Sequence, residues 1–215
     1  KLFLKPVVWI NKVDIGDIIS LDFNSAMVRV SDISKLNSEG YISTKVIIGG
    51  LVGSSKGVFF DRELNLPIYS SKDDFAINLA KKYGIKHFTL SFVDNKNDVE
   101  KFKELYPDAL RYSKIETLKA LVNIDEIIAV SNGILIDRGD LSSEVPIEKI
   151  PFVQKYVLNK ARKASKDAFI ATNTLERMSF SLKPDKSEVN DIINTILDGA
   201  TGIALTKETA IGKHP

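Results

Sequence analysis

The stretch Gly133-Ile-Leu-Ile-Asp-Arg-Gly-Asp-Leu141 joins an apolar segment to an acid that follows glycine. The apolar residues are typical of a buried strand, and we expect Asp140 to lie at the carboxyl end of that strand. In parallel α/β folds ligands bind at this end, because the loops converge there and the following helix presents free N–H groups. The stretch therefore predicts a ligand site in a parallel α/β fold.

A second segment offers similar chemistry. The segment Ala109-Leu-Arg-Tyr-Ser-Lys-Ile-Glu116 ends in Lys114 and Glu116, which a strand would direct to one face. If both strands belong to one barrel, Glu116 and Asp140 can hold a divalent cation while Lys114 adds positive charge, an arrangement suited to phosphate. Each feature also has a structural interpretation, since a Lys-x-Glu pair is often a solvated surface pair and Asp140 could cap the next helix.

From Ser71 onward, strand-like and helix-like segments alternate. The expected strands cover residues 87–93, 109–116, 133–136, 168–172 and 202–205. The expected helices cover residues 98–106, 118–130, 147–165 and 188–198, after a first helix that opens with a capping box of Ser71 and Asp74 and stops at Gly84. Five such strands in succession predict a parallel sheet, either doubly wound or part of a (β/α)₈ barrel.

Polar residues after each expected strand favour the barrel, with the site at its C-terminal mouth. These residues are Ser91, Lys114 with Glu116, Arg138 with Asp140, Thr172 with Asn173, and Lys207 with Glu208. Before residue 69 the pattern differs, with β-type alternation over residues 18–21, 26–30 and 45–48 and glycine-containing turns. We therefore expect two domains, a β-rich module over 1–68 and a barrel portion over 69–215.

Composition excludes several function classes. The 30 basic and 28 acidic residues form no aromatic-studded basic stripe, so we expect no nucleic-acid partner. Cysteine is absent, which excludes disulfides, thiolate nucleophiles and cysteine-ligated zinc in the printed sequence. The apolar runs of the sequence are shorter than the roughly 20 residues that a helix needs to cross a bilayer, so we expect a cytoplasmic protein without a membrane partner.

In order and spacing, several motifs resemble those of the pyruvate kinase family. They are Ser113-Lys-Ile-Glu116, Gly133 to Leu141, Val145-Pro-Ile-Glu-Lys-Ile-Pro-Phe-Val-Gln-Lys155, Ala171-Thr172, Glu188-Val189, Leu197-Asp198-Gly199 and Glu208-Thr-Ala-Ile-Gly-Lys213. Upstream, Gly49-Gly-Leu-Val-Gly-Ser-Ser-Lys-Gly-Val58 resembles the end of the family's lid domain. The resemblance implies a partial (β/α)₈ TIM barrel, strands four to eight, with a small β-rich lid domain.

The resemblance also implies an activity, the glycolytic conversion of phosphoenolpyruvate and ADP to pyruvate and ATP. By resemblance, Lys114 would stabilise the transferring phosphoryl group and the enolate, and Glu116 and Asp140 would bind Mg²⁺ or Mn²⁺. The N–H groups of Gly139 and Asp140 would bind the substrate carboxylate, and Thr172 would help to deliver the proton that makes pyruvate. The family's K⁺ site and nucleotide-binding residues belong to its first three barrel strands, which we do not find here. The full-length form is expected to be a homo-oligomer.

Two other functions stay open at this point. One is a non-catalytic paralogue that binds an anion or a partner protein, and the other is a metal-dependent keto-acid lyase on the same barrel. Two of the residues also have structural interpretations, because Thr172 could satisfy its own turn and Arg138 could pair with a nearby acid.

Overall fold

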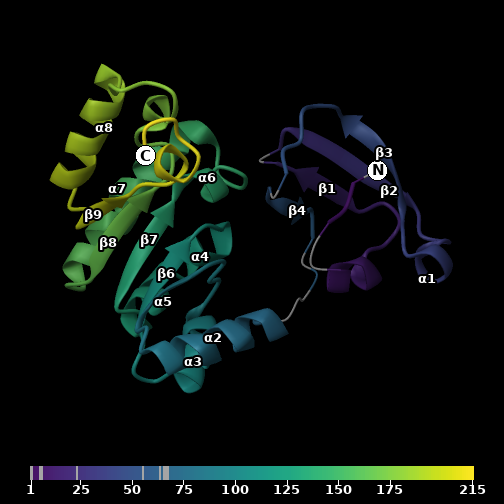
Figure 1. Ribbon diagram of the computed structural model, residues 1–215, viewed down its shortest axis with the longest axis horizontal. Helices are drawn as coiled ribbons and strands as arrows, with labels where there is room; N and C mark the ends of the chain where they lie inside the picture. Colours follow the sequence, from purple (N-terminus) through teal and green to yellow (C-terminus); the bar gives the residue numbers. More distant parts are fainter. Residues whose placement is uncertain (1, 5–6, 23, 55, 63, 65–67) are drawn as a thin grey trace. The chain divides into compact units, whose positions relative to one another are not determined.

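The computed structural model describes residues 2–4, 7–22, 24–54, 56–62, 64 and 68–215. Residue 55, within the glycine-rich segment 49–58, therefore lies outside the described residues. The chain divides into two compact units, Lys1–Ile68 and Tyr69–Pro215 (Figure 1). In the described part of the chain, no helix combines the length and the apolar character needed to span a bilayer.

The first unit is built on a four-stranded antiparallel sheet in the order β3-β2-β1-β4. Its strands are β1 (Ile18–Leu21), β2 (Ala26–Asp32), β3 (Ser43–Ile48) and β4 (Val58–Phe60), accompanied by the 3₁₀ helix η1 (Val7–Lys12) and helix α1 (Leu36–Glu39). Trp9 packs against Phe60 with a ring-centroid separation of 5.3 Å. The sequence pattern predicts the first three strands but not β4, whose three residues are too few to show alternation.

The second unit is built on a five-stranded parallel sheet in the order β5-β6-β7-β8-β9. Its strands are β5 (His87–Leu90), β6 (Leu110–Ile115), β7 (Gly133–Asp137), β8 (Asp167–Ala171) and β9 (Gly202–Ala204). The order follows the sequence without reversal, as in a segment of a (β/α)₈ barrel, whereas a doubly wound sheet reverses at a switch point. The carboxyl ends of all five strands therefore lie along one edge.

The helices of the second unit mostly occupy the expected positions. They are α2 (Ser71–Tyr83), α3 (Lys96–Leu105), α4 (Leu118–Val122), α5 (Ile124–Val130), α6 (Arg138–Leu141), α7 (Ile150–Lys163), α8 (Lys186–Leu197) and α9 (Lys207–Ala210), with 3₁₀ helices η2 (Ile147–Lys149) and η3 (Glu176–Ser179). The expected helix over 118–130 is two helices that meet at Asn123. A short helix at Gly139 and Asp140, as in α6, was expected from the resemblance, whereas α9 was not expected.

The capping box of α2 lies one residue before its expected position. Ser70 Oγ accepts a hydrogen bond from the Asp73 backbone N–H, and the Asp73 carboxylate accepts one from the Ser70 N–H. The prediction of Ser71 with Asp74 was wrong because both pairs have the same Ser-x-x-Asp spacing, which cannot decide between adjacent registers. Gly84 ends the helix in the left-handed conformation, as the pattern indicated.

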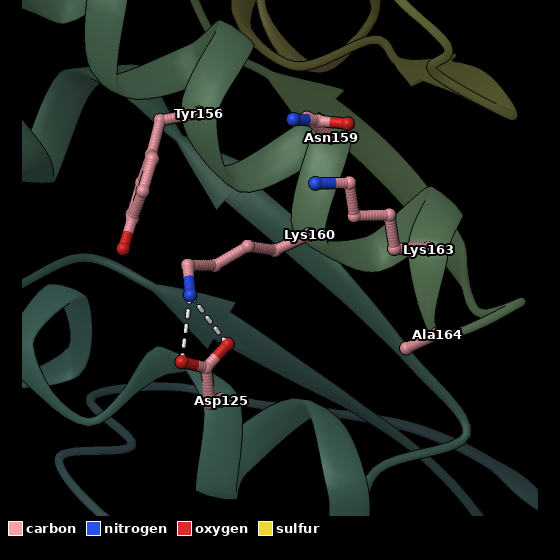
Figure 2. A pocket seen from close by; sticks show the side chains of 6 residues that line it. All are labelled: Asp125, Tyr156, Asn159, Lys160, Lys163 and Ala164. Carbon is pink, nitrogen blue, oxygen red and sulfur yellow. Dashed lines mark hydrogen bonds and ion pairs between the residues drawn. The ribbon is translucent and has the colours of Figure 1, made fainter.

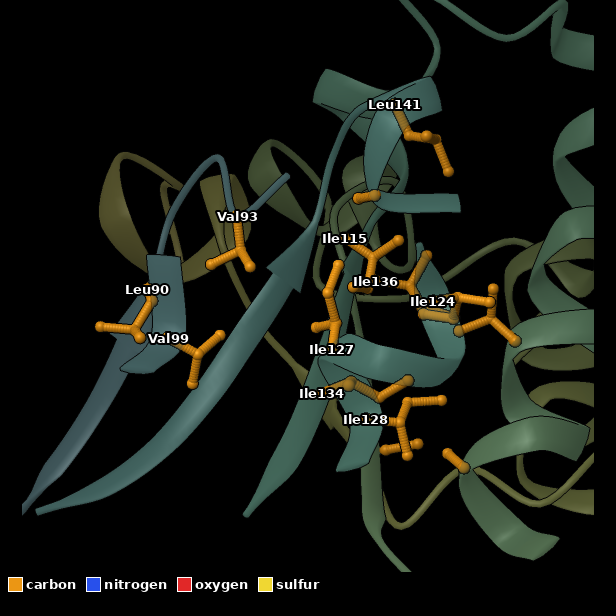
Figure 3. Packing of buried hydrophobic residues seen from close by; sticks show 14 of the residues in the cluster. Leu90, Val93, Val99, Ile115, Ile124, Ile127, Ile128, Ile134, Ile136 and Leu141 are labelled. Carbon is orange, nitrogen blue, oxygen red and sulfur yellow. The ribbon is translucent and has the colours of Figure 1, made fainter. Parts of the chain in front are cut away.

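The core of the second unit lies between the parallel sheet and its helices. Figure 3 shows isoleucines from β6 and β7 directed toward those of α5. Ile115, Ile134 and Ile136 are fully buried there. Side chains alternate along a strand, so Lys114, Leu135 and Asp137 lie on the opposite face of the sheet. Packing on one face thus determines which residues reach the other.

Candidate functional site

The candidate site lies at the carboxyl ends of three adjacent strands, β6, β7 and β8. The Lys114 ammonium forms a close ion pair with Glu116 Oε1 and lies 3.0 Å from Asp137 Oδ2. Glu116 is fully buried, and its Oε2 accepts a hydrogen bond of 2.6 Å from the Phe92 backbone N–H. Carboxylate oxygens of Glu116, Asp137 and Asp140 lie within 4.8 Å of one another. The site thus combines one ammonium group with three acids.

Burial and mutual charge set the protonation of this cluster. Burial raises the pKa of Glu116, although the Lys114 ammonium acts in the opposite direction. Burial also raises the pKa of Asp140, and the neighbouring charge of Asp137 raises it further. Burial acts to lower the pKa of Lys114, but the two carboxylates outweigh it and raise that pKa above its ordinary value. The lysine therefore stays charged at neutral pH. The raised pKa values of Glu116 and Asp140 mean that their carboxylates would be stabilised by a proton or by a metal cation.

Thr172 joins the cluster from the end of β8. Its Oγ1 accepts a hydrogen bond of 2.7 Å from the Gly139 N–H. The same hydroxyl lies within donating distance of Asp137 Oδ1, at 3.0 Å, and of the Ala171 carbonyl oxygen, at 2.6 Å. Its backbone is left-handed, with φ of 65°, and Asn173 follows at 56°. A β-branched residue rarely adopts this conformation, so surrounding contacts must stabilise it.

Arg138 provides those contacts. Its guanidinium donates hydrogen bonds to the carbonyl oxygens of Thr172, at 2.9 and 3.1 Å, and of Asn173, at 2.8 Å. It also pairs with Asp191 at 2.8 Å. The arginine thus binds both left-handed residues and anchors them to α8. This is the structural interpretation of Arg138, pairing with a nearby acid.

The structure brings together the five residues to which the resemblance assigns roles: Lys114, Glu116, Gly139, Asp140 and Thr172. One detail differs, because β7 ends at Asp137 and Asp140 lies in helix α6, past the strand end. Asp137 is therefore the acid at the end of the strand, and the sequence analysis missed it as a member of the site. Strand alternation was the available signal, since it puts Asp137 on the face opposite Ile136.

A separate surface pocket of about 450 Å³ lies between α5 and α7 (Figure 2). It is lined by Asp125, Tyr156, Asn159, Lys160, Lys163 and Ala164. The Lys160 ammonium binds both carboxylate oxygens of Asp125 at 2.6 Å and lies 5.0 Å from the Tyr156 ring centre. None of the residues predicted for the site lines this pocket, so the catalytic expectation does not extend to it.

Comparison with known proteins identifies the family of this fold and site. Residues 3–215 match the family model described as pyruvate kinase, barrel domain. The chain belongs to the pyruvate kinase family. The pyruvate kinase of Thermotoga maritima is 38% identical over 205 residues, and that of Methanocaldococcus jannaschii is 36% identical over 220 residues. These alignments cover 93% and 95% of this chain, but 43% and 49% of the relatives.

A crystal structure of a pyruvate kinase from Cryptosporidium parvum matches with a TM-score of 0.79 and 32% identity. The match covers 96% of this chain and 43% of that one. The predicted family and fold class, a partial pyruvate kinase barrel with a parallel sheet and a small antiparallel sheet, are confirmed. The chain spans less than half the length of these relatives, so the activity of a whole protein does not follow from the match alone.

Proposed function

We propose that this chain carries the phosphoenolpyruvate and metal half of a pyruvate kinase site. In the whole protein, that site would transfer the phosphoryl group of phosphoenolpyruvate to ADP, giving pyruvate and ATP. The observation that carries the proposal is the Lys114 ammonium among three carboxylates at the ends of adjacent parallel strands. Membership of the pyruvate kinase family supports the same reaction.

The acids fit a divalent cation. Hard carboxylate oxygens are the donors that Mg²⁺ and Mn²⁺ prefer. Opposite ligands of Mg²⁺ lie about 4 Å apart, so oxygens within 4.8 Å need to approach only slightly. Glu116 and Asp140 would hold the ion, which when bound would neutralise charge and orient substrate oxygens. The K⁺ and nucleotide sites of this proposal would be formed by other parts of the family's barrel.

The residues of this chain would act by positioning and by charge. Transfer breaks the bond between phosphorus and the enol oxygen and forms a bond from phosphorus to the terminal oxygen of ADP. Lys114 would offset negative charge on the phosphoryl oxygens and on the enolate that is left. Thr172 would help to deliver a proton to the enolate carbon, giving pyruvate. The Gly139 N–H now binds Thr172 Oγ1, so its use for the substrate carboxylate requires that hydrogen bond to open.

The first unit would be part of the family's β-rich lid, and the second the C-terminal part of its barrel. We propose that the whole protein is a cytoplasmic homo-oligomer whose partners are phosphoenolpyruvate, pyruvate and the adenine nucleotides. The relatives are named pyruvate kinase, which supports these substrates and nucleotides. No particular observation favours the anion-binding paralogue or the keto-acid lyase over the kinase.

The test is pyruvate formation by the full-length protein with phosphoenolpyruvate, ADP, Mg²⁺ and K⁺, followed through lactate dehydrogenase. Lys114→Met is expected to abolish turnover, because it removes the ammonium group without shortening the side chain greatly. Lys160→Met, which breaks an ion pair between α7 and α5 away from the site, is the matched control and should retain activity. Absence of turnover in the wild type, or equal turnover in Lys114→Met, would refute the proposal.

A further inference from the structure

We infer that Asp137 is a built-in competitor for anionic ligands, which lowers the affinity of the site for phosphoenolpyruvate. This inference rests on the proposed function, because it concerns the ligand of the same site. Asp137 is only 6% exposed to solvent, and both of its carboxylate oxygens face the site. Its role would be to set affinity rather than to take part in bond making.

Among the described residues, the Asp137 carboxylate contacts three groups that can donate hydrogen bonds. Oδ2 lies 3.0 Å from the Lys114 ammonium, whereas Oδ1 lies 3.2 Å from the Gly139 nitrogen and 3.0 Å from Thr172 Oγ1. Lys114, Gly139 and Thr172 are three of the groups proposed to meet the substrate. The carboxylate thus occupies, within the protein, the kind of position that a bound phosphate or carboxylate would take.

These contacts favour the role of an acceptor over that of a third metal ligand. A carboxylate has about four lone-pair directions, and the Lys114 ammonium, the Gly139 N–H (shared with Thr172 Oγ1) and the Thr172 hydroxyl (shared with the Ala171 carbonyl oxygen) already lie around Asp137. To bind an oxygen of Asp137, a metal ion would have to displace one of these donors. Glu116, which has two donors, the Lys114 ammonium and the Phe92 N–H, and Asp140 lie nearby and can supply carboxylate oxygens for a cation. The donors therefore indicate that Asp137 serves mainly as a counter-anion to Lys114.

An incoming anion must compete with Asp137 in two ways. It needs the same ammonium and N–H donors, and it must approach a buried negative charge at close range. At a few ångströms in a partly buried site, one such charge changes the affinity for an anion by about tenfold or more. Removal of the charge is thus expected to tighten binding, whereas damage to the fold would weaken it. The direction of the change separates the two explanations.

The experiment measures phosphoenolpyruvate binding by calorimetry, with Mn²⁺ at a fixed saturating concentration, in the full-length protein. Asp137→Asn removes the charge while keeping a side-chain oxygen that can cap α6, and Asp137→Ala removes both. Each variant is expected to bind phosphoenolpyruvate about tenfold more tightly than the wild type, and the difference should shrink as salt is added. Asp125→Asn, which removes an acid from α5 outside the cluster, is the control and should leave affinity unchanged.

Mn²⁺ binding, followed by electron paramagnetic resonance, provides a second readout. Mn²⁺ affinity in Asp137→Asn should fall less than in Glu116→Gln. A larger fall in Asp137→Asn would identify Asp137 as a metal ligand and overturn the inference.

The outcomes also distinguish the inference from the proposed function. If the wild type turns over but Asp137→Asn binds phosphoenolpyruvate no more tightly, the inference fails and the function stands. If Asp137→Asn binds more tightly but neither protein turns over, the inference stands and the kinase activity fails. If neither protein binds phosphoenolpyruvate, both fail. Should Asp137→Ala not fold, Asp137→Asn alone decides.

Discussion

Replacement of Lys114 by methionine should destabilise the second unit far more than a surface charge deletion. The change leaves Glu116, fully buried, and Asp137, 6% exposed, without their shared ammonium group. Loss of one partner from a buried ion pair costs about 3–5 kcal/mol. The Lys114 side chain is 19% exposed, so solvent screening favours the lower end of that range. We expect a loss of about 3 kcal/mol in the free energy of unfolding at neutral pH.

Protonation limits this loss and gives it a pH dependence. Burial already raises the pKa of Glu116, and removal of the Lys114 ammonium would raise it further. Uptake of a proton by Glu116 would relieve the uncompensated charge. It costs about 1.4 kcal/mol for each unit by which the pH exceeds the pKa of Glu116. The difference between wild type and Lys114→Met should therefore shrink as the pH falls. The wild-type lysine, whose pKa is raised, stays protonated at all pH values below its unfolded-state pKa, so the change with pH comes from the carboxylates.

The measurement is urea unfolding followed by circular dichroism at 222 nm, because most of the helical residues belong to the second unit. Fluorescence of Trp9 reports the first unit separately. Lys160→Met is the matched control, since its partner Asp125 is 76% exposed and such an exposed ion pair contributes little to stability. Equal stability of the two variants would refute the reasoning that Lys114 compensates buried charge.

Three further predictions concern local structure. Gly133→Ala should cost about 1–3 kcal/mol in urea unfolding, because a Cβ there would lie 2.8 Å from carbons of the Tyr112 ring. Ser70→Ala should lower the stability of the second unit by about 1 kcal/mol through loss of the α2 cap, measured in the same way. The Arg62 guanidinium holds the pKa of Asp17 below its ordinary value, so Asp17 stabilises the first unit above its unfolded-state pKa, and this contribution is lost as the pH falls through the folded-state pKa. Arg62→Met should therefore unfold at a higher pH on acid titration of tryptophan fluorescence.

The sequence predicts the barrel elements well where one physical signal dominates. Each β-strand of the second unit contains or borders an apolar run, and each run was assigned to the correct strand. The prediction is less accurate where the sequence pattern fits two positions of a helix start or end equally well. Ser70 and Ser71 offer the same capping pattern, and Asn123 interrupts a segment whose apolar periodicity continues on both sides. Neither choice follows from spacing, because tertiary packing decides both.

The site divides in the same way. Strand alternation and the carboxyl-end rule are sufficient to bring Lys114, Glu116 and Asp140 together. The left-handed backbone of Thr172 could not be predicted, because it is stabilised by Arg138, 34 residues away in the sequence. Asp137 was missed because the apolar pattern ends the expected strand at residue 136, one residue before the end of β7. That end is defined by pairing with β8, where Asp137 lies opposite Ala171.

The charge balance of the cluster makes cation binding a condition for anion binding. Three carboxylates face one ammonium group, so the unliganded cluster attracts cations and repels phosphate or carboxylate groups. A divalent cation would reverse that balance locally and free Lys114 from part of its pairing with Glu116. We therefore expect affinity for an anionic substrate to rise with divalent-cation concentration. Because Asp137 holds the same ammonium through a second carboxylate, this dependence should be weaker once its charge is removed.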